Sequence, residues 1–493
     1  MPATLAAALP GLTVDRTSAT PLHTQLAQAL RTAIATGQTP AGTRLPATRS
    51  LAAELSLGRN TVADAYDQLI AEGYLEARVG SGTRVATIDP DAFLATGASA
   101  NTADLPPPPL SKRGKALATA IRPVPPTPGR FGYAFQPGVP AFDAFPFAGW
   151  TRLAARAAKN MTAVGDYRHS GGLPTLRQAI ATHIKLARGV VCDPEQIIIT
   201  AGAQAALDLA SRLLIDPADK VWVEDPGYGG ARGAFIGAGA TLVPVPVDDE
   251  GMDLEAARKT RTRPRLIYVT PSHQFPMGVT MSLARRLALL DLADSTDAWI
   301  IEDDYDSEYR YQGRPLSSLQ GLEGGRRVVY IGTFSKTFFP SLRIGYLIAP
   351  KAHAEAFNTA IRNTGHTAPG LPQLALADFL NGGHYEAHAR RMRKLYDARR
   401  LKVLAALEHH TAKHLTPLVR EAGMQMPALF RRKRNDIAIA AMLAKNGIAA
   451  GSLSRYTLNK NNQRPGLLLG FAAVEERHIT PAARHMAALL DTA

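Results

Sequence analysis

Between Phe131 and about Pro350, short and almost wholly apolar runs alternate with stretches of helical character. Runs that are apolar at nearly every position indicate strands that are buried on both faces. Strands of this kind, separated by helices, assemble into a mostly parallel sheet with helices packed on both sides. The sequence therefore predicts an α/β domain around a mostly parallel, seven-stranded sheet. The predicted strands are Ile197–Thr200, Lys220–Val223, Thr241–Val245, Arg265–Val269, Trp299–Ile301, Val328–Ile331 and Ile344–Ile348.

A lysine follows one of these strands. Thr333, Ser335 and Lys336 come directly after Val328–Ile331, at the edge where open α/β sheets bind their ligands. Lys336 precedes Thr337-Phe338-Phe339-Pro340, and apolar surroundings lower the pKa of an amine and make it a nucleophile. Such a lysine can form an imine with an aldehyde cofactor. Taken alone, Lys336 is equally well a solvated residue at a strand end.

A carboxylate and a phenol follow a second strand. Asp303 and Tyr305 come after Trp299–Ile301 and are two residues apart, so on extended chain their side chains point the same way. The ring nitrogen of pyridoxal 5′-phosphate (PLP) needs a carboxylate partner to stay protonated, and a phenol near the ring oxygen would tune an imine. Together with Lys336 these residues indicate a PLP site, although Glu302-Asp303-Asp304 alone is typical of any polar strand end.

The first 88 residues have a different pattern. A helix is expected at 21–36, where Pro21 suits the first position and apolar residues form one face. A second helix capped by Thr48 and a third from Arg59 to Glu72 follow after short turns. Two short strands then flank Gly80-Ser81-Gly82 as a hairpin. Two helices joined by a tight turn and followed by a two-stranded wing predict a winged helix-turn-helix; a small protein-binding helical module is the alternative.

The third helix of this head is the candidate recognition helix. Its first residues occupy the place where such a helix meets base edges and phosphates. The glycines of the wing allow the backbone to come close to DNA. The residues expected to contact double-stranded DNA at an operator are Arg44, Arg49, Arg59, Asn60, Thr61, Ser81 and Gly82.

Charge and composition limit the partners and the compartment. The net charge is +14, but residues 1–88 hold seven Arg and six acidic residues, which is only about +1. Individual arginines, rather than the bulk charge, must therefore support DNA binding. No apolar run reaches the roughly 18 residues of a membrane helix, and the N-terminus lacks the basic region of a secretion signal. The single cysteine, Cys192, fits a reducing compartment. We expect a cytoplasmic protein without a membrane partner or a metal site.

Shifts in composition divide the chain into three parts. Residues 1–88 are the predicted DNA-binding domain. Residues 89–130 are expected to be a linker stiffened by proline, whose basic run at 112–115 is either solvated or in contact with the DNA backbone. Residues 131–493 are the predicted α/β domain, with a small C-terminal α+β subdomain from about residue 375.

Several motifs resemble known families and occur in matching order. The run Gly332-Thr333-Phe334-Ser335-Lys336-Thr337, together with Ile301–Tyr311 before it and Leu342–Tyr346 after it, resembles the fold-type I aminotransferases. Arg44-Leu45-Pro46 and Arg59-Asn60-Thr61-Val62 resemble the GntR family of regulators. Almost the whole chain is similar to the MocR/GabR-type regulators within the GntR group. This resemblance implies a winged-helix head joined to a PLP-dependent transferase fold.

The resemblance also implies roles for residues in a PLP site. Lys336 would hold PLP as an internal aldimine, Asp303 and Tyr305 would contact the ring, and Tyr228 would stack on it. Tyr167 matches a tyrosine that reaches the phosphate of the neighbouring subunit. The family forms a head-to-tail homodimer in which the winged helix of one chain packs on its partner, so a homodimer is implied here. The residues expected around the phosphate are Gly202, Ala203, Gln204, Thr333, Ser335 and Arg343.

The chain departs from the aminotransferase pattern at the substrate side. Where many aminotransferases carry Asn-Pro-Thr-Gly, it has Pro271–Gly278, so a bond to the ring oxygen is missing or comes from His273 or Gln274. Leu468 stands where an arginine often clamps the substrate carboxylate, which leaves Arg455 as the best remaining clamp. The γ-aminobutyrate-responsive relatives have an arginine two residues after the stacking tyrosine. That position is Gly230 here, and Arg232 is not equivalent by spacing, so γ-aminobutyrate is not the expected effector.

These expectations favour a PLP-dependent transcription regulator that senses PLP or an amino compound through an internal aldimine on Lys336. The sequence does not separate the amine sensor from a PdxR-like sensor of PLP itself. The alternative is a working aminotransferase with a DNA-binding head, since Lys336, Asp303 and Tyr305 are intact. Multiple turnovers with an amino acid and a keto acid would support the enzyme.

Overall fold

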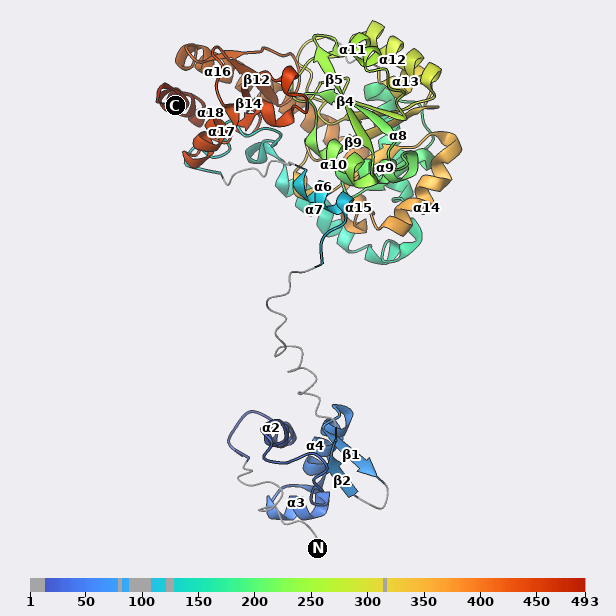
Figure 1. Cartoon of the computed structure of the whole chain (residues 1–493), viewed down its shortest axis with the longest axis vertical. Coiled ribbons are helices and arrows are strands. Elements are labelled where there is room, and N and C mark those ends of the chain that lie inside the picture. The colour runs from blue at the N-terminus through green and yellow to red at the C-terminus, as the bar shows by residue number, and fades with distance from the viewer. Residues whose placement is uncertain (1–13, 79–81, 88–107, 121–127, 314–316, 493) are drawn as a thin grey trace. The chain divides into compact units, whose positions relative to one another are not determined.

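The computed structural model describes residues 14–78, 82–87, 108–120, 128–313 and 317–492. The chain divides into two compact units, an N-terminal unit (Met1–Pro109) and a large unit (Leu110–Ala493), which are considered separately (Figure 1). Among the described residues, no helix is both long and apolar enough to cross a membrane.

The N-terminal unit is a winged helix-turn-helix. Its helices enclose a small core to which Leu26, Leu51 and Leu69 contribute, and the Tyr66 hydroxyl donates a 3.0 Å hydrogen bond to the Pro46 carbonyl. The two wing strands pair antiparallel. The wing tip, including Gly80 and Ser81, lies outside the described residues. The elements are α2 (Leu22–Ala35), α3 (Thr48–Glu54), α4 (Arg59–Ala71), β1 (Leu75–Arg78) and β2 (Gly82–Val85).

Two predicted helix starts were wrong by one position. Thr48 does not cap α3 but is its first residue, and the N-cap is Ala47, which makes no side-chain hydrogen bond. Pro21 is the N-cap of α2 rather than its first helical residue. Because Pro21 has no N–H and a fixed φ, it suits the N-cap and the first helical position equally well. Only the geometry of the folded helix distinguishes these two positions.

The large unit is built on an eight-stranded sheet of order β3-β10-β9-β8-β7-β4-β5-β6. All seven predicted strands are present, and the additional strand is the short edge strand β6. β10 runs antiparallel to both of its neighbours and β6 antiparallel to β5, whereas the other pairings are parallel. The strands are β3 (Ile197–Thr200), β4 (Lys220–Asp225), β5 (Thr241–Asp248), β6 (Gly251–Met252), β7 (Leu266–Val269), β8 (Trp299–Asp304), β9 (Val328–Thr333) and β10 (Gly345–Ile348).

Helices cover both faces of this sheet because alternate strand residues are apolar on opposite sides. Tyr330 and Ile348 face a core shared with α8 and α15, whereas Ile331 and Leu347 face one shared with α9, α10 and α14. The helices are α7 (Phe147–Ala158), α8 (Pro174–Arg188), α9 (Ala203–Leu214), α10 (Gly229–Ala238), α11 (Leu254–Lys259), α12 (Leu283–Thr296), α13 (Leu319–Glu323), α14 (Ala354–Thr364) and α15 (Gly370–Asn381). Short 3-10 helices are Phe142–Ala144, Met161–Ala163, Tyr167–His169, Pro194–Gln196, Pro340–Leu342, Lys351–His353, Leu453–Tyr456 and Lys460–Asn462.

A smaller α+β part follows, with an antiparallel sheet of order β11-β12-β14-β13. Its core also contains Phe135, whose backbone bridges to Gly470. It begins later than the predicted residue 375, because α15 and the first turns of α16 still pack on the larger sheet, as Tyr385 does. The elements are α16 (His384–His410), β11 (Leu415–Pro417), β12 (Gln425–Phe430), α17 (Asp436–Lys445), β13 (Gly451–Ser452), β14 (Gly466–Gly470) and α18 (Glu476–Asp491).

The predicted linker contains a helix that was not predicted from the sequence. α6 (Lys112–Thr119) belongs to the large unit and packs on α10. Ser111 caps it by accepting a 3.0 Å hydrogen bond from the Gly114 N–H. Leu117 lies over the α10 glycines Gly233 and Gly237, where the absence of side chains lets the two helices approach. The basic run at 112–115 is therefore helical, and its cations Lys112, Arg113 and Lys115 are exposed, as expected of a solvated run.

Candidate functional site

A cavity of about 180 Å³ opens at the carboxyl ends of β8 and β9. It brings together residues that the sequence places more than 130 positions apart. Every predicted cofactor residue except Tyr167 lines it: Gly202, Ala203, Gln204, Tyr228, Asp303, Tyr305, Thr333, Ser335, Lys336 and Arg343. The remaining lining residues were not predicted from the sequence: Gly138, Tyr268, Thr270, Phe275, Asp306, Pro340, Met424 and Gln425.

Lys336 is held by a glycine from a distant part of the chain. Its Nζ donates a 2.8 Å hydrogen bond to the Gly138 carbonyl. Gly138 has φ +71°, and a Cβ there would lie 2.9 Å from Nζ. Glycine adopts this φ without strain, and its lack of a Cβ leaves room for the amine. No local sequence signal identifies Gly138, since it comes from an irregular segment 198 residues before its partner.

Asp303 offers one carboxylate oxygen without a partner. Its Oδ2 accepts a 2.7 Å hydrogen bond from the Tyr268 hydroxyl. Its Oδ1 is buried and has no hydrogen-bond partner among the described residues. Burial raises the pKa of Asp303 to about 6, against the hydrogen bond from Tyr268 and the charge of Lys336. A cationic donor such as a protonated ring nitrogen would satisfy Oδ1 and stabilise the ionised carboxylate.

An anion cradle lies in the cavity at the N-terminus of α9. Gly202, with φ +90°, is the N-cap of α9, so the first N–H groups of that helix face the cavity. The Arg343 guanidinium lies beside it, 3.6 Å from where a Gly202 Cβ would be. The Thr333 and Ser335 hydroxyls are 3.1 Å apart at the end of β9. Helix N–H groups, two hydroxyls and a guanidinium form a donor set that fits a phosphate.

Aromatic rings form one wall of the cavity. Tyr228 packs edge-on against Phe275, and Phe275 contacts both Tyr305 and Tyr456 at centroid distances of 6.0 and 5.0 Å. His273 lies behind this wall, 2.9 Å from the Tyr305 hydroxyl and 3.0 Å from an Asp306 carboxylate oxygen. His273 thus supports Tyr305 and does not line the cavity.

Gln274 is also a structural residue. Its Nε2 donates to Glu224 and to the Pro226 and Phe275 carbonyls, and its Oε1 accepts from Met277. Of the two candidates for a ring-oxygen bond, neither lines the cavity among the described residues. Tyr305 does line it and stays the residue predicted beside the ring oxygen.

A second compartment of about 330 Å³ adjoins the first and shares Gly138, Tyr228, Phe275, Lys336 and Gln425 with it. Arg455 lines this compartment from its exposed rim. Leu468 is fully buried, so no clamp replaces the missing arginine at that position. Arg232 is also buried and is bound to Asp225 and to the Tyr456 carbonyl.

Tyr167 stands apart from the cavity. It lies in a 3-10 helix and is 92% exposed. It therefore contributes nothing to the cavity of its own chain among the described residues.

In the N-terminal unit, Arg59 and Asn60 open α4 and are exposed, whereas Thr61 is half-buried. Arg49 is exposed on α3. The Arg44 guanidinium lies beside Gly82, 3.3 Å from where a Cβ would be. Helix α4 and the wing thus carry most of the predicted DNA-binding residues, and Ser81 lies outside the described residues.

Glu224, beneath the cavity, is expected to make the large unit less stable as the pH rises. Burial raises the pKa of Glu224 from 4.5 to about 7, although Thr270 and Gln274 donate hydrogen bonds to it. The folded protein keeps a proton that the unfolded chain releases. The stability that this proton contributes to the folded state is complete below about pH 4.5 and is lost as the pH rises through about 7.

Glu224→Gln should flatten this dependence. Between pH 4.5 and 7 the unfolding free energy of the Glu224→Gln apoprotein should fall less than that of the wild-type apoprotein. The difference should be on the order of 3 kcal/mol. All three tryptophans, Trp150, Trp222 and Trp299, lie in the large unit, so their fluorescence in urea follows that unit alone. Glu255→Gln, on the exposed face of α11, is the control and should keep the wild-type profile. If Glu224→Gln showed the same pH profile as the wild type, Glu224 would not be the source of this pH dependence.

Comparisons with known proteins identify the two units. Residues 22–85 match the bacterial regulatory proteins of the gntR family, and residues 138–485 match aminotransferase class I and II. The chain is 45% identical to the probable rhizopine catabolism regulatory protein MocR of Rhizobium meliloti, over 94% of this chain and 93% of that protein. It is 35% identical to the HTH-type pyridoxine biosynthesis transcriptional regulator PdxR of Corynebacterium glutamicum, over 93% of each.

A solved aminotransferase has the fold of the large unit. LysN, an α-aminoadipate aminotransferase from Thermus thermophilus in complex with N-(5′-phosphopyridoxyl)-L-leucine, aligns with a TM-score of 0.67 and 26% identity. The alignment covers 78% of this chain and 95% of that one. The fold family binds PLP, and the partnerless Asp303 oxygen and the anion cradle fit that cofactor. The chain belongs to the MocR-type subfamily of GntR transcription regulators, in which a DNA-binding winged helix-turn-helix precedes an aminotransferase-like, PLP-binding domain.

Proposed function

We propose that occupancy of the cavity around Lys336 controls how tightly the winged helix holds its operator. The supporting observation is that one cavity unites the Lys336 amine, the partnerless oxygen of Asp303 and the anion cradle at α9. Bound PLP supplies an aldehyde that reacts with primary amines. A change in DNA affinity requires the cavity's ligand to favour one of two states of the protein.

Each group around the cavity would have a distinct task. Lys336 would hold the cofactor covalently, and the Gly138 carbonyl would orient the amine before the cofactor arrives. Asp303 would keep the ring nitrogen protonated, and Tyr268 would fix the carboxylate. Gly202, Ala203 and Gln204, with Thr333, Ser335 and Arg343, would bind the phosphate.

A homodimer, arranged head-to-tail, would complete the site. Tyr167 is 92% exposed, which suits a residue that serves a neighbouring subunit. Phe147, 46% exposed, and Met161, 41% exposed, add apolar surface on elements near it in sequence. Exposed apolar groups of this kind often mark contacts between proteins.

Recognition of the operator by α4 predicts the effect of a single substitution. Arg59→Ala should weaken operator binding by about 1–3 kcal/mol if Arg59 reads a base. Arg31→Ala removes the same charge from the same unit, but Arg31 is paired with Glu72 at 2.5 Å, so its effect should be smaller. Fluorescence anisotropy on operator and unrelated DNA separates base reading from phosphate contact. If Arg59→Ala bound the operator as tightly as the wild type, residues other than Arg59 would have to recognise the bases.

The effector is proposed to be a primary amine or PLP itself. Arg455, on the rim of the second compartment, would bind a carboxylate if the effector carries one. The experiment is operator affinity of the holoprotein against a panel of amino compounds, measured for the wild type and Arg455→Ala. A carboxylate effector should act more weakly on Arg455→Ala, whereas an uncharged amine should act equally on both. An undiminished response to every carboxylate compound would remove Arg455 from the site.

A further inference from the structure

Most of the positive charge of this DNA-binding protein lies outside its DNA-binding unit. Residues 1–88 carry a net charge of about +1, and the rest of the chain about +13 of the total +14. Affinity for duplex DNA depends strongly on cations that neutralise phosphates and release counterions. A nearly neutral winged helix supplies little of this charge, so further phosphate contacts have to come from another part of the protein.

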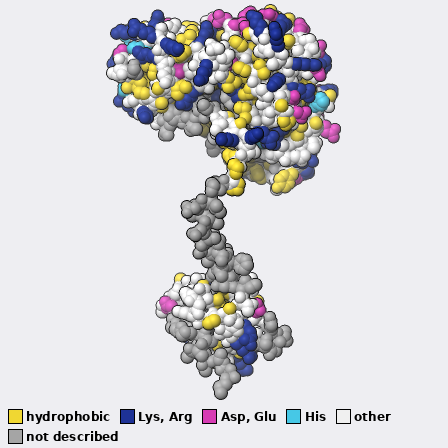
Figure 2. Space-filling view, in the orientation of Figure 1, with side chains coloured by type: hydrophobic (Ala, Val, Ile, Leu, Met, Phe, Trp, Pro, Cys, Tyr) yellow, Lys and Arg dark blue, Asp and Glu magenta, His cyan; other side chains and the backbone are white. Residues whose placement is uncertain are grey.

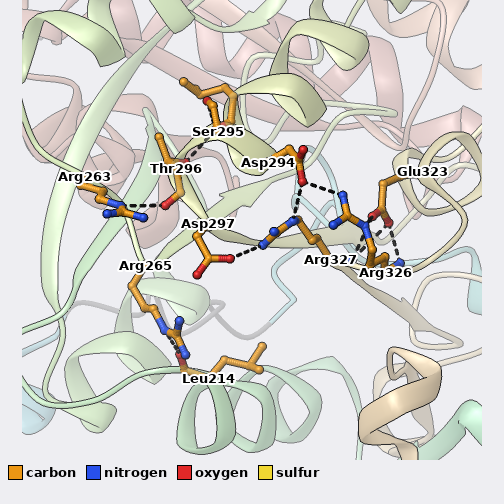
Figure 3. A network of polar contacts seen from close by, with 11 residues as sticks. Leu214, Arg263, Arg265, Asp294, Ser295, Thr296, Asp297, Glu323, Arg326 and Arg327 are labelled. Atoms are coloured by element: carbon orange, nitrogen blue, oxygen red, sulfur yellow. Dashed lines mark hydrogen bonds and ion pairs between the residues drawn. The ribbon is translucent and has the colours of Figure 1, made fainter.

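Many surface cations of the large unit are already neutralised. Figure 3 shows one such network, in which Arg326 and Arg327 contact Asp294 at 2.6 and 3.0 Å and Arg327 contacts Asp297 at 2.7 Å. Hydrogen bonds from these arginines lower the pKa of Asp294 and of Asp297. Such cations have little capacity left for a polyanion.

A cluster that differs, which we call the basic edge, consists of Lys413, Arg431, Arg432, Lys433 and Arg484. All five side chains are exposed, and none forms an ion pair with an acid within the described part of the chain. Figure 2 shows Lys and Arg side chains on the part of the large unit where Figure 1 labels α16, α17 and α18.

The fold holds the basic edge together. β11 and β12 pair from Leu415 opposite Phe430, and the Arg431 N–H donates to the His414 carbonyl at 2.9 Å. Lys413 and Arg432 therefore emerge at the same end of the small sheet. The charge of Arg484 reaches His410 at the end of α16, where burial, His409 and Arg484 lower the pKa of His410.

The acids near the basic edge do not cancel it. Asp491, which contacts His414 at 2.8 Å, and Glu408 on α16 are exposed, but they set two negative charges against the five positive charges of the basic edge. Asp436 is buried and accepts hydrogen bonds from the Ser454 and Gly466 N–H groups. The outward-facing charge at this end of the sheet is thus positive.

We propose that the basic edge is a second DNA-contacting surface, which binds backbone phosphates of duplex DNA without reading bases. Charge complementarity with the protein's established partner supports DNA as the occupant. Flexible Lys and Arg side chains on a loop and a helix suit phosphate contacts, which position a protein but carry no sequence information. The winged helix would read the operator, and the basic edge would add affinity to any duplex.

The test is the salt dependence of DNA binding by the full-length holoprotein. Arg431→Gln/Arg432→Gln/Lys433→Gln should reduce the slope of log K against log salt concentration by about 2–3 in magnitude. Binding to operator and to unrelated duplex should weaken by similar factors. The visible absorbance of bound PLP checks that the large unit is folded.

The control removes the same charge from another surface. Arg258, Lys259 and Arg261 are exposed in and just after α11, and Arg258 is paired with Glu255. Arg258→Gln/Lys259→Gln/Arg261→Gln should leave the slope close to that of the wild type. Equal losses in both triple variants would reduce the effect to net charge and overturn the proposal. An unchanged slope in Arg431→Gln/Arg432→Gln/Lys433→Gln would also overturn the proposal. The basic edge would then be a candidate surface for an acidic protein partner.

Discussion

Purified Lys336→Ala is expected to lack the visible absorbance of a PLP imine, which the wild type should keep after gel filtration. Lys336 Nζ is placed in the cavity by the Gly138 carbonyl at 2.8 Å. No other lysine lines the cavity or its second compartment among the described residues. Removing this amine removes the only covalent attachment, and only the contacts of Asp303 and of the anion cradle at α9 are left.

Lys351→Ala is the matched control for this prediction. Lys351 is 82% exposed and paired with Asp193 at the surface, so its loss should leave the absorbance unchanged. The phosphate content of both variants after gel filtration shows how much PLP the noncovalent contacts retain. A wild-type spectrum in Lys336→Ala would contradict the cofactor assignment, whatever the fate of DNA binding.

Arg188→Met is expected to destabilise the large unit by about 3–5 kcal/mol. Arg188 Nε lies 2.7 Å from Asp304 Oδ2, and the two side chains are only 8% and 2% exposed. Loss of the arginine leaves a carboxylate charge buried without its counterion. Tyr330 and Ser307 still donate hydrogen bonds to Oδ2, but Oδ1 has no partner within the described residues.

Two further variants make this prediction specific. Arg188→Met/Asp304→Asn removes both charges and should recover much of the lost stability. Arg212→Met breaks an ion pair with Asp208 whose arginine is 57% exposed, and it should cost less than about 1 kcal/mol. Urea unfolding followed by tryptophan fluorescence reports all three. A double variant as unstable as Arg188→Met would mean that shape, and not the unpaired charge, dominates the cost.

The sequence predicts the sheet and the centre of the site well because both rest on local patterns. Apolar runs identify the seven longer strands of the large sheet, and polar residues at or just beyond the carboxyl ends of two of them, Asp303 and Lys336, meet in one cavity. The two-residue spacing of Asp303 and Tyr305 places both in that cavity. Asp304, between them, points to the opposite side and pairs with Arg188, as the alternation of strand residues requires.

Contacts between distant segments could not be predicted. Gly138 binds Lys336, and Phe135 bridges to Gly470. Residues 131–141 show no periodicity from which either contact could be predicted. Tyr268 reaches Asp303 only because β7 and β8 are neighbours in register. Helix α6 was missed because Pro and Gly on both sides made the whole stretch resemble a linker.

Operator affinity of the apoprotein, measured by fluorescence anisotropy during a titration with PLP and then with amines, tests the central claim most directly. The DNA is the region upstream of the protein's own gene, and Lys336→Ala is measured beside the wild type. Control of DNA binding by the cavity predicts that PLP or an amine changes the affinity or stoichiometry of the wild type, and that the Lys336→Ala protein does not respond in the same way. Tight binding by the wild type that is indifferent to both PLP and every amine would contradict it.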